Sequence, residues 1–243
     1  MAGDWPWVVL VGLGVAAVGL LAYWELIVAE GAHLGPRVVA LLYDWVAHRY
    51  DDEIKKFDTV TESEILGLPL TLELAEVAAP RVLDVAAGTG RVARALLREV
   101  AFDGALVNVD LAPRMLAVGR AACAPPGIAK AAPERVAWAR AAADRLPFPA
   151  GAFDAVTCLE ALEFLPDARA ALRECLRVLK PGGLLVTTNR VSWEGRLILG
   201  KTFTRTAFRQ LLADLDLEAV RVEPWLVDYD LAWARRPVAG GGA

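Results

Sequence analysis

The stretch VLDVAAGTG, residues 82–90, decides the fold because it reads as a short buried strand, a glycine turn and the start of a helix. Gly88 and Gly90 allow a ligand to approach the backbone closely. The helix that begins at Arg91 offers unpaired N–H groups in its first turn. Twenty residues after Gly90, Asp110 ends a second apolar run, where a carboxylate can accept hydrogen bonds from both hydroxyls of a ribose. These features predict a nucleotide site.

Strand and helix patterns alternate from this stretch to the C-terminal part of the chain. Asp167 stands where it can cap one of the helices, and the segment 180–183 (KPGG) should end that helix. We expect strands at 81–85, 105–110, 135–140, 153–158, 184–188, 217–222 and 229–235, and helices at 91–100, 113–122, 168–179 and 206–215. The alternation predicts an α/β fold with a mostly parallel sheet and helices on both faces.

Residues 5–24 (WPWVVLVGLGVAAVGLLAYW) form a second distinctive segment, because these twenty residues carry no charge. As a helix they would span about 30 Å, the thickness of the hydrocarbon core of a bilayer. Trp5 and Trp7 at one end and Tyr23 and Trp24 at the other match the aromatic belts of a membrane span. The segment predicts a transmembrane helix, and the alternative is a buried core helix.

The charges around this segment predict its orientation and its retention. No Lys or Arg precedes it, whereas Arg37, Arg49, Lys55 and Lys56 follow it, so the rest of the chain should face the cytoplasm. A cleaved signal peptide begins with a basic region, which the first four residues lack. We therefore expect an uncleaved, single-pass anchor in the cytoplasmic membrane.

The composition excludes several classes of protein. Apolar residues make up 56% of the chain and the mean hydropathy is +0.39, which is too hydrophobic for a disordered chain and high for a soluble enzyme. The 26 basic and 30 acidic side chains give a net charge of −4, which argues against coating nucleic acid. Cys123, Cys158 and Cys175 form no CxxC pair and there are only two histidines, so we expect neither a disulfide scaffold nor a metal site.

Four motifs follow one another along the chain. They are VLDVAAGTG at 82–90, VDLAPRML at 109–116, RLPFPAGAFDAVTCLEALEFLPD at 145–167 and LRVLKPGGLLVTTN at 176–189. In this order they resemble the class I S-adenosylmethionine-dependent methyltransferases, over roughly residues 43–235. The resemblance implies a Rossmann-like, seven-stranded sheet and S-adenosyl-L-methionine as the cofactor.

The resemblance also implies roles for individual residues. Asp84 and the glycine turn would hold the amino-acid part of the cofactor, Asp110 would hold the ribose, and Met115 would pack near the adenine. Leu159 and Glu160 would face the methionine end and the incoming substrate. The residues implied to bind the cofactor are Asp84, Ala86, Gly88, Gly90, Asp110, Leu111, Met115, Ala143, Asp144 and Leu159.

Two positions depart from the pattern of this family. Ala86 stands where many relatives have glycine, and it is small enough that we expect it to fit. Ala142 stands where many relatives carry an aspartate that reads the adenine amine. Because this carboxylate is missing, we expect a lower affinity for the cofactor.

The segment YDWVAHRYD, residues 43–51, is similar in spacing to the N-terminal cap of the ubiquinone/menaquinone C-methyltransferase group, in which this segment lies over the cofactor cleft. Tyr43 and Tyr50 are seven residues apart, so a helix would place them on one face. The alternative is a solvated amphipathic helix. The weak catalytic candidates are His48, Tyr50 and Glu160, and for His48 the alternative is a surface histidine. No catalytic acid is obligatory, because the protein chiefly positions the reactants, and a base matters only when the acceptor must lose a proton, as phenol or carbon acceptors do.

We therefore expect four segments: a transmembrane anchor at 1–29, a helical linker and active-site cap at 30–75, a methyltransferase domain at 76–236 and a flexible tail at 237–243. The expected function is a membrane-anchored methyltransferase acting on a small lipophilic acceptor, such as a quinone-like molecule, an isoprenoid or a phospholipid. Its partners would be that substrate and the membrane, without nucleic acid. The segment 191–200 is either a contact with acceptor or membrane or an ordinary loop.

Three other readings remain open. The first is a non-catalytic membrane-anchored scaffold that retains the fold, which Ala142 favours. The second is a nicotinamide-dependent oxidoreductase, which the absence of full GxGxxG spacing in 82–90 disfavours. The third is a protein or RNA methyltransferase. The net charge disfavours RNA, and no Asn-Pro-Pro-Tyr-type motif follows the strand at 153–158.

Overall fold

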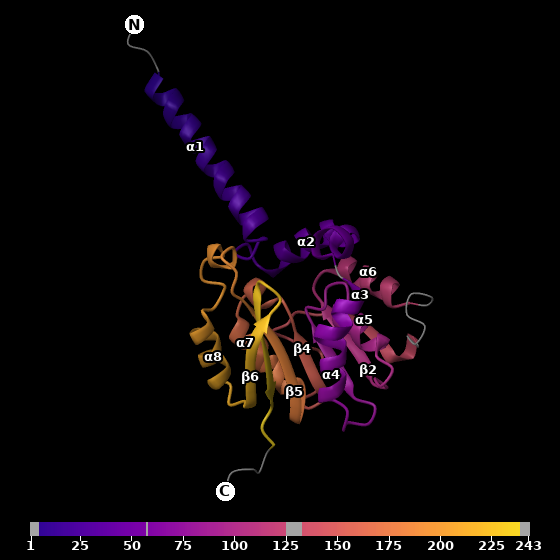
Figure 1. The fold of residues 1–243 in the computed structure, drawn as a ribbon. Helices are drawn as coiled ribbons and strands as arrows, with labels where there is room; N and C mark the ends of the chain where they lie inside the picture. The colour runs from indigo at the N-terminus through magenta and orange to yellow at the C-terminus, as the bar shows by residue number, and fades with distance from the viewer. Residues whose placement is uncertain (1–4, 57, 125–132, 239–243) are drawn as a thin grey trace.

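A sheet of seven strands occupies the centre of the structure, a computed structural model that describes residues 5–56, 58–124 and 133–238 (Figure 1). The strands are β1 (Arg81–Val85), β2 (Ala105–Asp110), β3 (Val136–Arg140), β4 (Phe153–Cys158), β5 (Leu179–Arg190), β6 (Glu218–Trp225) and β7 (Tyr229–Arg235). Their order is β3-β2-β1-β4-β5-β7-β6, and only β7 runs antiparallel to its two neighbours. The expected seven-stranded, mostly parallel sheet is confirmed.

The strand order reverses beside β1, and this reversal creates the place for a ligand. The chain runs outward from β1 to β2 and β3 and then returns to place β4 on the other side of β1. The connections after β1 and β4 therefore diverge to opposite sides and leave a crevice at the carboxyl ends of these strands. In the register of the sheet, Asp84 on β1 lies between Asn108 on β2 and Thr157 on β4.

Helices cover the sheet and precede it along the chain. The α-helices are α1 (Trp5–Tyr23), α2 (Pro36–Val46), α3 (Thr59–Glu62), α4 (Leu68–Glu73), α5 (Arg91–Arg98), α6 (Pro113–Cys123), α7 (Ala168–Val178) and α8 (Arg205–Ala213). Shorter π and 3-10 turns are η1 (Trp24–Val28), η2 (Ala47–Arg49), η3 (Tyr50–Lys55), η4 (Ser63–Gly67), η5 (Pro133–Arg135), η6 (Leu162–Phe164) and η7 (Gly195–Leu197). The segment expected to be helical, 30–75, is thus a series of short helices.

Two hydrophobic cores lie on opposite faces of the sheet because strand side chains alternate between the faces. Val82 faces the core that contains Leu96 of α5, whereas Leu83 faces the core that contains Leu172 of α7 and Phe208 of α8. All five side chains are 0 to 1% exposed. The expected packing of helices on both faces is confirmed.

The junction between α7 and β5 differs from the sequence-based expectation. Asp167 caps α7 as expected, since its side chain accepts a hydrogen bond from the Ala170 N–H. The segment 180–183 lies beyond the end of α7 as expected, but it is also part of β5. Its backbone pairs with the end of β7, because the Gly182 N–H donates to the Arg236 carbonyl and the Arg236 N–H donates to the Gly183 carbonyl. The strand expected at 184–188 is therefore longer at both ends.

Helix α1 stands clear of the rest of the protein (Figure 1). With η1 it forms an apolar span, Trp7–Val28, of 22 residues with a mean hydropathy of 2.1, none of it buried. Its length and composition fit a membrane span or a signal sequence. The expected anchor and tail reach beyond the described residues, since 1–4 and 239–243 lie outside them.

Candidate active site

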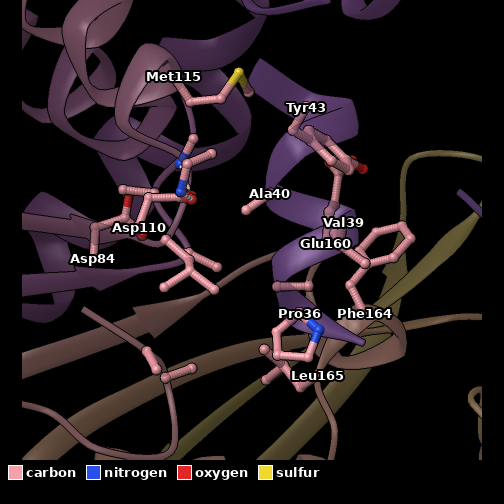
Figure 2. A pocket seen from close by; sticks show the side chains of 18 of the residues that line it. Pro36, Val39, Ala40, Tyr43, Asp84, Asp110, Met115, Glu160, Phe164 and Leu165 are labelled. Carbon is pink, nitrogen blue, oxygen red and sulfur yellow. Dashed lines mark hydrogen bonds between the residues drawn. The ribbon is translucent and has the colours of Figure 1, made fainter. Parts of the chain in front are cut away.

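A cavity that is partly open to solvent lies between the carboxyl ends of β1, β2 and β4 and the helix α2. Figure 2 shows the α2 side chains on one side of it and Asp84, Asp110 and Met115 on the other. The α2 wall consists of Pro36, Val39, Ala40 and Tyr43. Most of the lining is apolar, and carboxylates stand at a few fixed places. Such a lining is typical of a small-molecule site.

The turn after β1 is shaped by three residues with left-handed backbone. Ala86, Gly88 and Gly90 have φ values of 56°, 54° and 74°. Ala86 fits, as expected, but as a non-glycine residue in this region it stores strain of about 1 kcal/mol. Gly90 does not line the cavity. A Cβ there would collide with the ring of Trp138, so this glycine is needed for packing at the start of α5.

Asp110 ends β2 with its carboxylate fixed at the cavity wall. Its Oδ2 accepts a hydrogen bond of 2.8 Å from the Gly88 N–H, and its Oδ1 accepts one of 2.8 Å from the Ala112 N–H. Burial raises the pKa of Asp110, although these backbone N–H groups oppose the rise. Each oxygen keeps a further lone pair for a ligand, so the carboxylate is an oriented acceptor of two more hydrogen bonds.

Asp84 lies deeper, at the end of β1, and is 2% exposed. The Thr157 hydroxyl donates a hydrogen bond of 2.6 Å to Asp84 Oδ1. Burial raises the pKa of Asp84 to about 7, the Thr157 hydrogen bond opposes this rise, and the charge of Asp110 adds to it. Asp84 therefore changes its charge near neutral pH, and a cation placed beside it would favour its ionised form.

A buried ion cluster borders the cavity on the side of α5. Arg91 binds Glu62 through two hydrogen bonds of 2.5 and 2.9 Å and also pairs with Glu160, which accepts a 2.5 Å hydrogen bond from Lys55. Burial opposes the charge on Arg91, but Glu62 and Glu160 raise its pKa overall. Burial likewise acts to raise the pKa of Glu160, but Lys55 and Arg91 hold it below the usual value. Arg91 and Glu160 therefore stay ionised at neutral pH.

A second set of contacts holds the expected cap against the glycine turn. The Asp51 carboxylate accepts a 2.5 Å hydrogen bond from the Thr89 hydroxyl and pairs with Arg94. Tyr43 and Tyr50 both line the cavity, with ring centroids 5.7 Å apart. They meet as expected, although the α-helix ends at Val46 and continues as η2 and η3.

Next to the cavity, a group of buried and partly buried polar side chains connects the cap to β5 and β7. The Tyr43 hydroxyl donates a 2.7 Å hydrogen bond to Glu30, which pairs with Arg190 at 3.3 Å. Tyr229 donates a 3.2 Å hydrogen bond to Glu163, and burial raises the pKa of Glu163 to about 7. The cap is thus tied to the last strands as well as to α5.

The structure brings together all but one of the residues implied to bind the cofactor. Those that line the cavity are Asp84, Ala86, Gly88, Asp110, Leu111, Met115, Ala143, Asp144 and Leu159. Gly90 lies behind the wall, and Ala142, which lacks the usual carboxylate, lines the cavity. In the described part of the chain, no group of three His, Cys, Asp or Glu side chains could hold a metal ion.

The structure places the three catalytic candidates differently relative to the cavity. His48 is exposed and does not belong to the cavity wall, so the structure does not bring it to the site. Tyr50 lines the cavity, but burial and the charge of Glu160 raise its pKa well above the usual value, which keeps it protonated. Glu160 also lines the cavity, but it is engaged by Lys55 and Arg91. None of the three is therefore poised as a general base.

The wall of the cavity formed by α2 and residues 164–166 was not predicted from the sequence. Its residues are Pro36, Val39, Ala40, Phe164, Leu165 and Pro166. The four apolar or aromatic positions 36, 39, 40 and 43 have the i, i+3, i+4, i+7 spacing of one helix face, and this signal could have identified them. Arg91 and its partners come from distant parts of the chain and carry no local signal.

The fold and the site together define a class of protein. A parallel sheet with one antiparallel strand, a glycine turn after β1 and a carboxylate at the end of β2 make up the Rossmann-like methyltransferase fold. Residues 83–187 match the family model described as a methyltransferase domain. This part of the chain is an S-adenosylmethionine-dependent methyltransferase domain, with S-adenosyl-L-methionine as the methyl donor.

Two proteins of similar sequence carry the names of quinone methyltransferases. The chain is 38% identical over 152 residues to demethylmenaquinone methyltransferase of Clavibacter sepedonicus, covering 62% of this chain and 57% of that one. It is 38% identical over 169 residues to the ubiquinone/menaquinone biosynthesis C-methyltransferase UbiE of Ectopseudomonas mendocina, covering 67% and 64%. The chain thus spans less than two thirds of the length of these relatives.

Solved structures share the fold at lower identity. The [4+2]-cyclase SpnF matches with a TM-score of 0.67 and 19% identity, over 84% of this chain and 97% of that one. A SAM-dependent methyltransferase from Aquifex aeolicus matches with a TM-score of 0.59 and 19% identity, over 76% and 97%. Because one of the two is a cyclase, the fold alone does not determine the reaction.

Proposed function

We propose that the protein is a membrane-anchored methyltransferase that transfers a methyl group from S-adenosylmethionine to a small, lipophilic, quinone-like acceptor. One observation carries the proposal: a single cavity combines the fixed Asp110 carboxylate on one side with the apolar α2 wall on the other (Figure 2). The similarity to quinone methyltransferases supports the same class of acceptor. Isoprenoids and phospholipids are the other lipophilic acceptors that an apolar wall can admit.

The residues present fit the cofactor. The remaining lone pairs of Asp110 suit the two ribose hydroxyls, and Asp84 offers a buried carboxylate for the ammonium group. A Cβ at Gly88 would lie 3.4 Å from Met115 Cε, so the turn has the close backbone surface that an adjoining nucleoside needs. When bound, S-adenosylmethionine supplies an electrophilic methyl group on a positively charged sulfur.

The contribution of the chain to methyl transfer is positioning. The α2 wall, with Phe164 and Leu165, excludes water and offers apolar contact to a flat ring. Tyr50 stays protonated and Glu160 stays paired, so the cavity wall orients the acceptor without a strong base among these groups. Orientation at short range supplies a large part of the rate enhancement in such displacements.

Helix α1 supports the anchor in this proposal. Residues 7–23 of its apolar span are exposed, a large apolar surface of the kind that a bilayer covers. Arg37, Arg49, Lys55 and Lys56 lie on its C-terminal side, which supports a single pass with the enzyme domain in the cytoplasm. A tethered enzyme meets a lipophilic acceptor at high effective concentration.

The test uses membranes from cells that lack quinone methylation, the purified full chain and S-adenosylmethionine with an isotopically labelled methyl group. We expect label in a quinone fraction on mass analysis of the extracted lipids. Label confined to isoprenoids or phospholipids would contradict the acceptor class. Binding of the cofactor without any labelled lipid would instead support the non-catalytic scaffold, the reading that Ala142 favours.

The raised pKa of Asp84 predicts a pH-dependent affinity for the cofactor. Because Asp84 ionises at about 7, affinity for S-adenosylmethionine should rise from about pH 5.5 to about 7, where an α-ammonium with a pKa of about 7.7–8.0 still keeps most of its charge. Titration calorimetry of Asp84→Asn should give weaker binding and no such rise. The matched control is Asp144→Asn at the exposed rim, which should keep the slope.

The cofactor-free protein offers a second measurement for the same group. A carboxyl with a raised pKa favours the folded state at low pH, so its contribution to stability is present below about pH 4 and declines as the pH rises to about 7. Asp84→Asn should remove this decline from a series of denaturation curves. An unchanged pH dependence would contradict the assigned pKa.

A further inference from the structure

The end of the apolar span is bonded to the loop after β5. The indole Nε1 of Trp24 donates a 2.9 Å hydrogen bond to the Leu197 carbonyl, and His33 Nε2 lies 2.8 Å from the Leu199 carbonyl oxygen. Between Leu197 and Leu199, the side chain of Ile198 is fully buried and packs with Ala29. If the span crosses a bilayer, Trp24 marks the headgroup layer, where Trp side chains concentrate, and the bonded loop lies at the same depth.

This loop displays apolar side chains toward solvent. Trp193 is 69% exposed and Leu199 is 66% exposed, and neither covers another part of the protein. The exposed Arg196 and Glu194 stand between them in the chain, and Glu194 pairs with Arg190 at 3.9 Å. Aromatic and aliphatic side chains combined with a cation are typical of a surface that enters the headgroup layer.

Helix α2 has the same character on its outer face. Its inner face lines the cavity, whereas Arg37, Leu41 and Trp45, spaced four residues apart, form the opposite stripe. Leu41 is 67% exposed and Trp45 is 70% exposed. In Figure 1, α2 lies at the end of the protein from which α1 leaves, and because its inner face lines the cavity, its outer face is turned away from the cavity. This helix therefore fits the description of an interfacial amphipathic helix.

We propose that the outer face of α2 and the loop 193–199 form a second membrane contact that rests in the headgroup layer of an anionic phospholipid bilayer. The proposal rests on the anchor proposed above and extends it, because α1 alone would leave the domain free to tilt. Arg37 and Arg196 supply the attraction to anionic lipid, although the whole chain has a net charge of −4. A bilayer is favoured over a protein partner because the surface continues the apolar span directly.

The contact has a direct consequence for the substrate. Helix α2 would have lipid against one face and the cavity against the other, so the cavity would lie one helix diameter, about 10 Å, below the bilayer surface. A lipophilic acceptor could then pass from the bilayer to the α2 wall without crossing water. The contact thus links the lipid as partner to the acceptor class of the same site.

The test measures depth with a nitroxide spin label at single introduced cysteines in the full chain. Leu41→Cys and Trp193→Cys report on the proposed contact, Val15→Cys reports on the span, and Val100→Cys is the aqueous control. Val100 is 83% exposed and follows the C-terminal end of α5, at the sheet edge opposite the cavity. The native Cys123, Cys158 and Cys175 are buried and should resist labelling.

The protein is reconstituted in phosphatidylcholine vesicles with phosphatidylglycerol, and collision rates with oxygen and with a water-soluble nickel complex are compared. We expect the spin labels at positions 41 and 193 to collide with the nickel complex severalfold less often than the label at position 100. They should also lie at a shallower depth in the bilayer than the label at position 15. If the labels at positions 41 and 193 are as accessible to the nickel complex as the label at position 100, while the label at position 15 lies deep in the bilayer, the proposed contact is overturned and the anchor stands. An aqueous label at 15 would refute the anchor and, with it, this inference. Equal depths in vesicles without phosphatidylglycerol would overturn the role of the arginines.

Discussion

Replacing Asp110 with alanine should weaken the binding of S-adenosylmethionine by about tenfold or more, as expected for losing hydrogen bonds to a charged group. The substitution removes the proposed acceptor for the ribose. It also leaves the Gly88 and Ala112 N–H groups without the carboxylate that now orients the turn. Both effects act on the same wall of the cavity, so this is the largest loss of affinity that we expect from a single change. Titration calorimetry measures it directly.

Two variants keep this prediction specific. Asp110→Asn retains one carbonyl oxygen, so its affinity should lie between those of the wild type and Asp110→Ala. Asp103→Ala removes an exposed carboxylate just before the amino end of β2 and should bind normally. Unchanged affinity in Asp110→Ala, with a normal denaturation curve, would remove Asp110 from the cofactor site.

Replacing Arg91 with methionine should lower the free energy of unfolding by about 3–5 kcal/mol, the scale of breaking a buried ion pair from one side. The change leaves the carboxylates of Glu62 and Glu160 buried without their shared cation. It also removes the guanidinium that lies 4.7 Å from the centre of the Trp225 ring. Urea denaturation followed by circular dichroism measures the loss.

The control is Arg98→Met on the same helix, where the side chain is exposed and the change should cost little. Arg91→Lys keeps a charge but not the two-pronged contact with Glu62, so its stability should lie between the wild type and Arg91→Met. Equal stability of Arg91→Met and Arg98→Met would show that the ion cluster contributes nothing to the fold.

Most of the sheet could be predicted from the sequence because each strand is a short apolar run with its own boundaries. The strand at 81–85 and the helix start at Arg91 follow from local pattern alone. The expected start of the strand at 184–188 was wrong for a physical reason. The segment 180–183 ends the helix as expected, but pairing with Arg236 extends β5 through its glycines, and that partner is more than fifty residues away in sequence.

In the site, too, residues within local motifs could be predicted, whereas contacts between distant segments could not. Asp84 and Asp110 lie in motifs whose role depends on neighbouring residues, and both line the cavity. The contact of Arg91 with Glu62 and Glu160 joins three separate segments, so no window of sequence contains it. His48 looked reactive in the sequence only because histidines are scarce, and its position on the outside follows from the way the cap packs.

The paired charges of the cap have a consequence for turnover. Lys55 and Asp51 join the cap to Glu160, Thr89 and Arg94, so a methylated product that leaves past the cap requires these partners to separate first. Product release should then be slower than methyl transfer, and a burst in the first cycle should reveal it. Because Lys55 is partly exposed to solvent, added salt should weaken its pairing and accelerate the steady state.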